Sequence, residues 1–292
     1  IHNLEILIGE RTYFFNIVEV FEFDFFLLYG TDITSVKDKE MILSKLSKYF
    51  SPQVYSSIFS GKLDVNITTN RKNLTVFFSD IKGFTTITEK LEPEKLTEFI
   101  THYLTQMTDI AIAYGGTVDK YIGDAIMIFF GDPTTKGLTD DAIDCVSMAL
   151  KMQEKLKLIK KKWKSFGITE TLDVRMGIHT DICTVGNFGS KDRLDYTVLG
   201  NGVNLASRLE SSAKPNEILI SDNTYNIIRK DIKCKYVGEI KVKGKAHPVK
   251  TYQVKNLILG KDEKEMIEYP IYIEIPEDYW VVTTTADVDD EG

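Results

Sequence analysis

The chain has 292 residues, of which 43% are hydrophobic and 27% charged, so one large soluble domain with a smaller addition fits it. The net charge of −7 disfavours nonspecific binding to nucleic acid but leaves nucleotide binding possible, because a local cluster of cations suffices for that. No apolar run approaches a membrane span, and the three scattered cysteines predict neither a disulfide framework nor a zinc site, which favours a reducing cytoplasmic setting.

Residues 1–34 predict three short strands, in LEILI, RTYFFNIVEV and FDFFLLYGTDIT. Three strands cannot bury a core alone, so we expect the end of a larger domain. The chain begins with Ile rather than Met, and we therefore treat it as a fragment. A membrane anchor in a preceding segment stays open.

Residues 35–72 predict a helix to about position 59, followed by the polar linker GKLDVNITTNRKN. Val36, Leu43 and Phe50 repeat every seven residues, which is a short coiled-coil pattern. A single amphipathic connector helix explains the same spacing equally well.

Residues 73–256 predict an α+β domain of the ferredoxin-like type, with strands and helices in the order β-α-β-β-α-β-β-α and a final hairpin. Apolar residues from Leu96 to Ile110 recur at helical spacing, and a second helix is predicted over 140–160. The segments LDVRMGIHT and ICTVGNFG read as two further strands. The tail, 257–292, carries no motif that we can interpret.

Two aspartates end strands of this domain. Asp80 closes the strand in FFSDIKGFT, and Asp124 lies at the tip of the hairpin VDKYIGDAIMIFF. Alone, Asp80 can be a helix cap and Asp124 part of a plain turn. Together, carboxylates from adjacent strand ends can hold two divalent cations about 4 Å apart, which suits an in-line displacement at phosphorus.

Three basic or amide-bearing motifs accompany the aspartates. Asn204 and Arg208 in NGVNLASRLES share a helix face and can hold a sugar oxygen and a phosphoryl oxygen, or form a solvated face. Lys243 in IKVKGK can clamp a phosphate or belong to an edge-strand row of lysines. Arg175 in VRMGIHT faces either solvent or phosphate.

In their order along the chain, VFFSDIKGFT, KYIGDAIM, VRMGIHT, VGNFGS, DYTVLGNGVNLASRLES and IKVKGKAHPVKTYQV resemble the class III nucleotidyl cyclases. The resemblance implies a dimeric catalytic domain that converts a nucleoside triphosphate to its 3′,5′-cyclic monophosphate and pyrophosphate. It implies two Mg²⁺ (or Mn²⁺) ions per site on Asp80 and Asp124, and a transition-state pair at Asn204 and Arg208.

The resemblance also implies residues that bind the substrate. Its purine-selecting positions fall on Lys120 and Thr197. Its phosphate contacts fall on the backbone of Ile81, Lys82, Gly83, Phe84 and Thr85, and on Arg175 and Lys243.

Lys120 and Thr197 favour adenine. Lys120 can donate to adenine N1, and the Thr197 hydroxyl can accept from the 6-amino group. Guanine presents the reverse pattern and would favour Glu at position 120, and unpaired buried groups discriminate strongly. We therefore expect an adenylate cyclase acting on ATP, with a guanylate cyclase or a catalytically silent cyclase-like module as alternatives. Asn201 and Asp181 depart from the residues common in the family, which leaves rate and regulation open.

Geometry favours a homodimer with shared active sites. Lys120 and Asp124 face the same side of a strand but stand roughly 13 Å apart at about 3.3 Å per residue. In the family's arrangement, one chain supplies the metal-binding aspartates and the other the purine-selecting and transition-state residues. One cyclase domain per chain then gives a two-fold homodimer.

The first 34 residues resemble the end of a PAS sensor domain, because YGTDITSVKDKE is similar to the Asp-Ile-Thr sequence that leads into a signalling helix. The resemblance implies an upstream sensor domain in the same chain and a helix that pairs across the dimer. We expect neither a nucleic-acid partner nor a membrane span in this segment.

Overall fold

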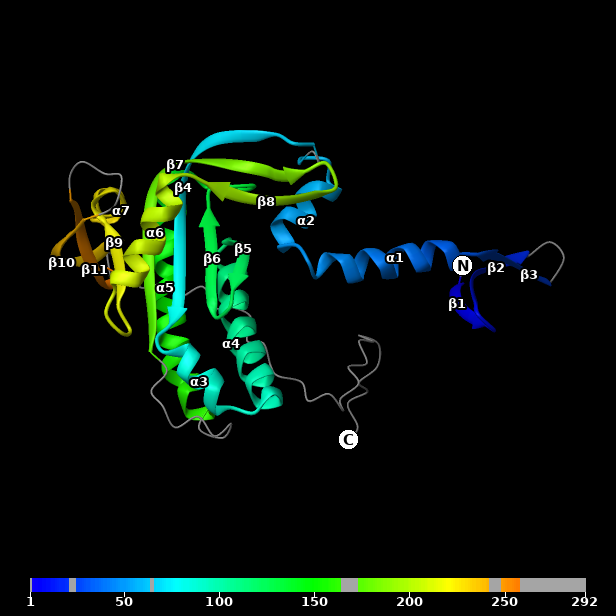
Figure 1. Ribbon diagram of the computed structural model, residues 1–292. Helices are drawn as coiled ribbons and strands as arrows, with labels where there is room; N and C mark the ends of the chain where they lie inside the picture. Colours follow the sequence, from blue (N-terminus) through cyan, green and yellow to red (C-terminus); the bar gives the residue numbers. More distant parts are fainter. Residues whose placement is uncertain (1, 21–24, 64–65, 164–172, 242–247, 258–292) are drawn as a thin grey trace, which may run out of the picture. The chain divides into compact units, whose positions relative to one another are not determined.

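The computed structural model describes residues 2–20, 25–63, 66–163, 173–241 and 248–257 (Figure 1). The chain divides into a unit of residues 1–258 and a unit of residues 259–292, and the second lies outside the described residues. The predicted C-terminal tail beyond residue 257 lies outside the described residues, and so does Lys243, which falls in the gap between residues 241 and 248. Of the helices that are described, none is long and apolar enough to cross a bilayer.

The three predicted N-terminal strands are confirmed as β1 (His2–Ile8), β2 (Arg11–Val20) and β3 (Phe25–Asp32), which form one antiparallel sheet. Where burial in this sheet is described, no residue is buried. Leu7 and Phe26 are each 69% exposed. Among its described residues the sheet thus has no core of its own.

The prediction of a single connector helix is wrong, because this segment forms two helices, α1 (Thr34–Ser47) and α2 (Pro52–Phe59). Pro52 occupies the first turn of α2, and Ser51 caps it by accepting a hydrogen bond from the Val54 amide at 3.4 Å. Phe50 lies in the break, so the heptad pattern does not continue. Gln53 of α2 donates to the Gly116 carbonyl at 2.8 Å.

Strands between residues 69 and 257 form an eight-stranded sheet, with the order β10-β11-β9-β7-β4-β6-β5 and β8 paired to β7. All its pairs are antiparallel except β7 with β9. The strands are β4 (Thr69–Ile81), β5 (Thr117–Ile122), β6 (Ala125–Phe130), β7 (Val174–Ser190), β8 (Arg193–Leu199), β9 (Ile218–Ser221), β10 (Ile232–Ile240) and β11 (Val249–Leu257).

The strands differ from the prediction in two respects. Strand β4 begins at Thr69, inside the segment predicted as linker. The two strands predicted around position 181 are one continuous strand, β7, because residues 174–186 pair with β4 along its whole length. The α+β class itself is confirmed.

Within the described residues, five helices pack against this sheet: α3 (Phe84–Lys90), α4 (Pro93–Ala113), α5 (Leu138–Trp163), α6 (Asn201–Ser212) and α7 (Asp222–Ile228). Alternate residues of β4 point to opposite faces. Phe77 packs in one core with α4 and α5, whereas Val76 and Phe78 pack in another with Ala206 of α6. From Leu74 to Ser79, β4 is therefore buried on both faces, which explains the apolar run LTVFF there, whereas residues 69–73 are polar and exposed.

Helix α6 lies directly against β7 at Gly177. A Cβ atom there would stand 2.1 Å from the Glu210 backbone nitrogen and 2.5 Å from the Ala206 carbonyl oxygen. Only glycine permits so close an approach of helix and strand. The position of α6 over the sheet is thus set by contact between two backbones.

Candidate active site

The structure brings the two predicted metal-binding aspartates together. Asp80 ends β4, and Asp124 lies in the turn between β5 and β6, where Gly123 has a φ of 65°. Asp124 is 8% exposed, and its Oδ2 accepts a hydrogen bond from the Ile81 amide at 2.8 Å. The turn thus holds Asp124 against the end of the strand that carries Asp80.

The carboxylates of Asp80 and Asp124 carry like charges and repel each other. Burial raises the pKa of Asp124 to about 6; the hydrogen bond from Ile81 opposes the rise and the negative charge of Asp80 adds to it. A divalent cation would relieve that repulsion, and carboxylate oxygens are the ligands that Mg²⁺ prefers. The described residues contain no cluster of three or more His, Cys, Asp or Glu side chains suited to a metal. Asp80 and Asp124 are thus the two carboxylates at this turn that could hold a divalent ion, and a metal site there stays a prediction.

Arg175 has a different environment from the one predicted. Its register on β7 places it opposite Asp80, and its guanidinium pairs with the Asp80 carboxylate. Its Nε lies 3.2 Å from Glu210 Oε1, and Nη1 donates to the Ser211 carbonyl at 3.4 Å. A phosphate would have to compete with two carboxylates for this cation.

Glu210 was not foreseen from the sequence. It lies on the buried side of α6, where burial raises its pKa to about 7 although the charge of Arg175 lowers it. The available signal was an acidic residue four positions after buried Ala206, where an apolar residue is expected. Glu210 and Asp80 together hold Arg175 in place.

The predicted phosphate cradle is partly occupied by the protein itself. The Ile81 amide donates to Asp124, and the Lys82 amide donates to the Asp173 carbonyl at 2.8 Å. Gly83, with a φ of 75°, caps α3, and the amides at the start of a helix have no partner within that helix. Of the five predicted amides, those of Gly83, Phe84 and Thr85 fit the prediction best.

Asn204 and Arg208 lie on the exposed side of α6, whereas Leu205, Ala206 and Leu209 are buried. The predicted shared face is confirmed. Within the described part of the chain neither polar side chain has a hydrogen-bond or ion-pair partner. Both are therefore available to a ligand or to a second chain.

Lys120 and Thr197 come together around a third residue, Asp119. The Thr197 hydroxyl donates to Asp119 Oδ2 at 2.6 Å, and Lys120 Nζ lies 3.7 Å from Asp119 Oδ1. The Asp119 side chain is 2% exposed, and burial raises its pKa although Thr197 and Lys120 lower it. Asp119 and Lys120 also line a cavity of about 250 Å³, together with Tyr49 and Phe50 from the connector.

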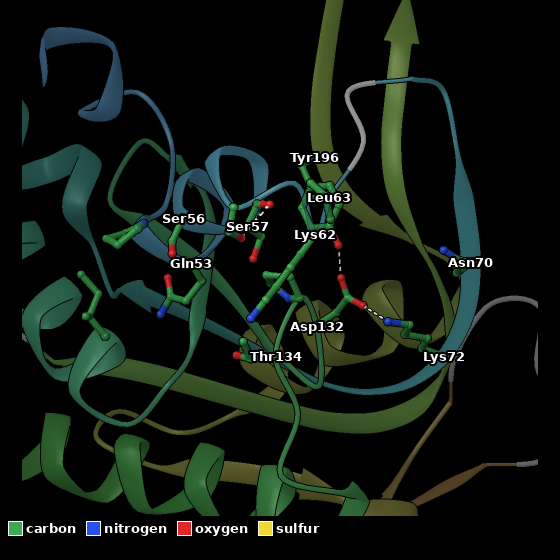
Figure 2. Close-up of a pocket in the computed structure, with 14 residues that line it drawn as sticks. Gln53, Ser56, Ser57, Lys62, Leu63, Asn70, Lys72, Asp132, Thr134 and Tyr196 are labelled. Atoms are coloured by element: carbon green, nitrogen blue, oxygen red, sulfur yellow. Dashed lines mark hydrogen bonds and ion pairs between the residues drawn. The ribbon is translucent and has the colours of Figure 1, made fainter. Parts of the chain in front are cut away.

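Another cavity, of about 550 Å³, lies beside α2 (Figure 2). At its edge the Asp132 carboxylate pairs with Lys72 and accepts a hydrogen bond from the Tyr196 hydroxyl. None of the described residues that line it belongs to the predicted site. Its contacts instead tie β8, the strand that carries Thr197, to the loop after β6.

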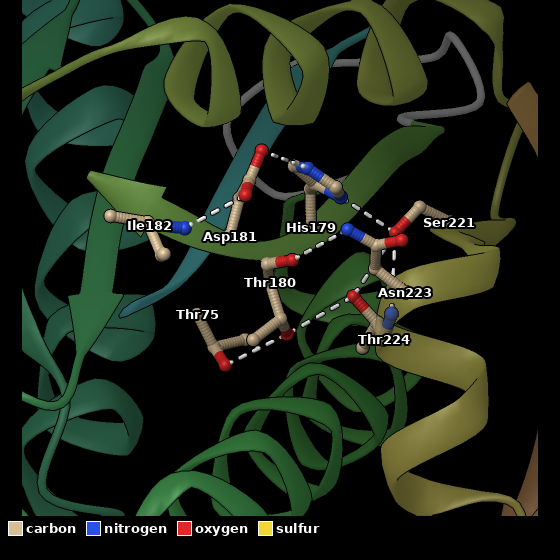
Figure 3. Close-up of polar contacts among 8 residues, drawn as sticks. All are labelled: Thr75, His179, Thr180, Asp181, Ile182, Ser221, Asn223 and Thr224. Carbon is tan, nitrogen blue, oxygen red and sulfur yellow. Dashed lines mark hydrogen bonds and ion pairs between the residues drawn. The ribbon is translucent and has the colours of Figure 1, made fainter. Parts of the chain in front are cut away.

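His179, Asp181 and Ser221 have the composition of a nucleophilic triad (Figure 3). His179 Nδ1 lies 2.6 Å from Ser221 Oγ, and Nε2 lies 3.3 Å from Asp181 Oδ2. Ser221 is completely buried, however, and its hydroxyl caps α7 by accepting from the Thr224 amide. No substrate can reach this serine, so the network holds β7 to β9 and α7.

Residues 67–256 match the family model for the adenylate and guanylate cyclase catalytic domain. This match covers more than half of the chain, and the chain belongs to that family. The match begins at residue 67, so the PAS-like segment before it stays a prediction.

Individual relatives include both kinds of cyclase. The chain is 30% identical over 197 residues to Adenylate cyclase 1 of Rhizobium meliloti (strain 1021), a match that covers 67% of this chain and 29% of that protein. The chain thus spans less than a third of that relative's length.

The crystal structures that share the fold include an adenylyl cyclase and a guanylyl cyclase. The adenylyl cyclase CyaB from P. aeruginosa is 52% identical, with a TM-score of 0.64 over 65% of this chain and 97% of that one. The guanylyl cyclase Cya2 is 32% identical, with a TM-score of 0.62 over 65% of this chain and 95% of that one. The fold is thereby confirmed, whereas the choice of base must be argued from the site.

Proposed function

We propose that this chain carries the catalytic domain of an adenylate cyclase, which converts ATP to 3′,5′-cyclic AMP and pyrophosphate. The observation that supports it is the meeting of Lys120 and Thr197, from β5 and β8, at one carboxylate. An ammonium donor beside a hydroxyl acceptor matches N1 and the 6-amino group of adenine. It does not match guanine, whose N1 donates and whose O6 accepts.

In this proposal Asp80 and Asp124 hold two divalent cations. These ions, when bound, would lower the pKa of the ribose 3′-hydroxyl and neutralise the leaving pyrophosphate. The like charge of the two carboxylates and the raised pKa of Asp124 are consistent with a site that gains from added positive charge.

The remaining roles fall to groups that orient and neutralise. Asn204 would hold a ribose oxygen so that the 3′-oxygen lies in line with the α-phosphorus. The new bond forms between these two atoms as the bond from the α-phosphorus to the leaving oxygen breaks. Arg208 would offset the charge that develops on the phosphoryl oxygens.

We further propose a homodimer with two shared sites. The exposure of Asn204 and Arg208, and their freedom from partners in the described chain, support contributions across an interface. A cytoplasmic location and a PAS-like sensor that acts through α1 complete the proposal. Removal of residues 1–47 should then change cyclase activity, whereas α2 must be retained because Gln53 bonds to the catalytic part.

The function is tested with purified protein, Mg²⁺ or Mn²⁺, and either ATP or GTP. We expect cyclic AMP from ATP and little cyclic GMP. Cyclic GMP alone would identify a guanylate cyclase. No product from either nucleotide would leave only the silent cyclase-like module.

A further inference from the structure

We propose that Asp119 is a positioning residue for base selection: by taking the hydroxyl proton of Thr197, it leaves Thr197 able only to accept a hydrogen bond from the base. The inference rests on the proposed adenylate cyclase function and deepens it. It explains why a threonine, whose hydroxyl can normally either donate or accept, would favour adenine over guanine.

The backbone places Asp119 where this is possible. Strand β5 has an irregular register against β6, since Val118 pairs with Ile128 and Lys120 with Met127, and Asp119 is the extra residue. In a regular strand, neighbouring side chains point to opposite faces. Because a bulge redirects side chains, Asp119 and Lys120 can lie on the same side of the strand, where their charged groups are 3.7 Å apart.

The polarity of the Thr197 hydroxyl follows from its contact with Asp119. An ionised carboxylate only accepts, so the single hydroxyl proton must lie between Thr197 Oγ1 and Asp119 Oδ2, which are 2.6 Å apart. Thr197 is itself 5% exposed, which limits the alternative orientations of its hydroxyl. The lone pairs of Thr197 remain for the 6-amino group of adenine, and they would repel O6 of guanine.

Asp119 also restrains the second selecting group. Lys120 Nζ lies 3.7 Å from Asp119 Oδ1 while its side chain stays 42% exposed. An ammonium group has three donors, so one directed at Asp119 leaves others for adenine N1. One buried carboxylate thus contacts both residues that read the base: it accepts from the Thr197 hydroxyl and forms an ion pair with Lys120.

The first experiment uses the unaltered protein and two ATP analogues of similar size. N6-methyl-ATP presents an N–H donor at position 6, whereas 6-methoxypurine riboside triphosphate presents an oxygen acceptor, and both keep N1 as an acceptor. We expect kcat/KM to be about tenfold higher for N6-methyl-ATP, the scale of one hydrogen bond gained against one repelled. Equal use of the two analogues would overturn the inference.

The second experiment changes Asp119. In Asp119→Asn the amide can donate to Thr197 and release the hydroxyl proton towards the base, so the preference for N6-methyl-ATP should fall about tenfold. Thr197→Val should lose the preference as well, and Asp119→Asn added to it should change nothing further. A merely structural role would instead lower kcat/KM for both analogues equally, or change the ratio in the Thr197→Val background.

The experiments distinguish a failure of the adenylate cyclase function from a failure of the role of Asp119. If the unaltered protein makes no cyclic AMP from ATP, the proposed function is wrong. If it makes cyclic AMP but does not distinguish the analogues, only the role of Asp119 is wrong. Gel filtration and thermal unfolding of each variant identify loss of folding, and the analogue comparison on the unaltered protein does not depend on them.

Discussion

Two carboxylate clusters of the catalytic part differ in how their charge is compensated. In the first, Arg175 pairs with Asp80 and Glu210, Asp124 lies against Asp80, and the pKa values of Asp124 and Glu210 are raised to about 6 and about 7. In the second, Asp119 lies beside Lys120 and accepts a hydrogen bond from the Thr197 hydroxyl. The first cluster gains from additional positive charge. In the second, burial also raises the pKa of Asp119, but each of its carboxylate oxygens already faces a partner, so the carboxylate can serve to orient those groups.

The largest effect is expected from Asp124→Asn. The amide oxygen can still accept from the Ile81 amide, so the fold should persist, but half of the metal-binding charge is lost. Cyclic AMP formation should fall about 10³-fold or more. The measurement is the initial rate at saturating ATP and Mn²⁺, with circular dichroism as the control for folding. A variant that keeps a tenth of the activity would argue against metal binding at this turn.

The next effect separates the two halves of the shared site. Asp80→Ala and Arg208→Ala should each be inactive alone. Mixed in equal amounts, they should recover about a quarter of the unaltered activity, because half of the dimers would be heterodimers with one intact site. The assay follows cyclic AMP after mixing and re-equilibration. Persistent inactivity of the mixture, with heterodimers demonstrated by tagged pull-down, would contradict a site shared between chains.

Lys120→Glu tests whether the exposed lysine of the second cluster selects the base. Glu cannot donate to adenine N1 but can accept from guanine N1–H, so kcat/KM for ATP should fall about 10²-fold and the relative use of GTP should rise. Lys120→Met is the matched control, because it removes the donor without supplying an acceptor. If both variants show the same ratio of ATP to GTP use, Lys120 does not read the base.

The smallest effect concerns stability without metal. Since burial raises the pKa values of Asp124 and Glu210, these two groups bind more protons in the folded protein than in the unfolded chain between about pH 4 and pH 7. These two groups therefore make the free energy of unfolding rise as the pH falls through that window. Urea unfolding at pH 7 and pH 5 should show a smaller rise for the Asp124→Asn/Glu210→Gln protein than for the unaltered one. An equal rise would place the proton uptake elsewhere.

The sequence predicted those features that depend on local pattern. The apolar period of α4 and the Gly-Asp turn that holds Asp124 both follow from neighbouring residues, and the structure agrees with each. The break before Pro52 was equally local, but the seven-residue spacing concealed it.

Other features depend on residues that are distant in sequence. The contact of Arg175 with Glu210 arises only when α6 packs on β7. The role of Asp119 depends on a bulge, whereas regular alternation would have turned it away from Lys120. Neither could be read from the spacing of residues, because each is decided by tertiary packing.

Helix α6 carries Asn204 and Arg208 on its exposed side and Glu210 on its buried side, and Glu210 reaches Asp80 through Arg175. In the proposed dimer, these two sides would serve different active sites. A displacement of α6 over Gly177 caused by substrate in one site would then move Arg175 at the aspartates of the other. The two sites would be thermodynamically linked, and ATP turnover would show cooperativity that originates in this single helix.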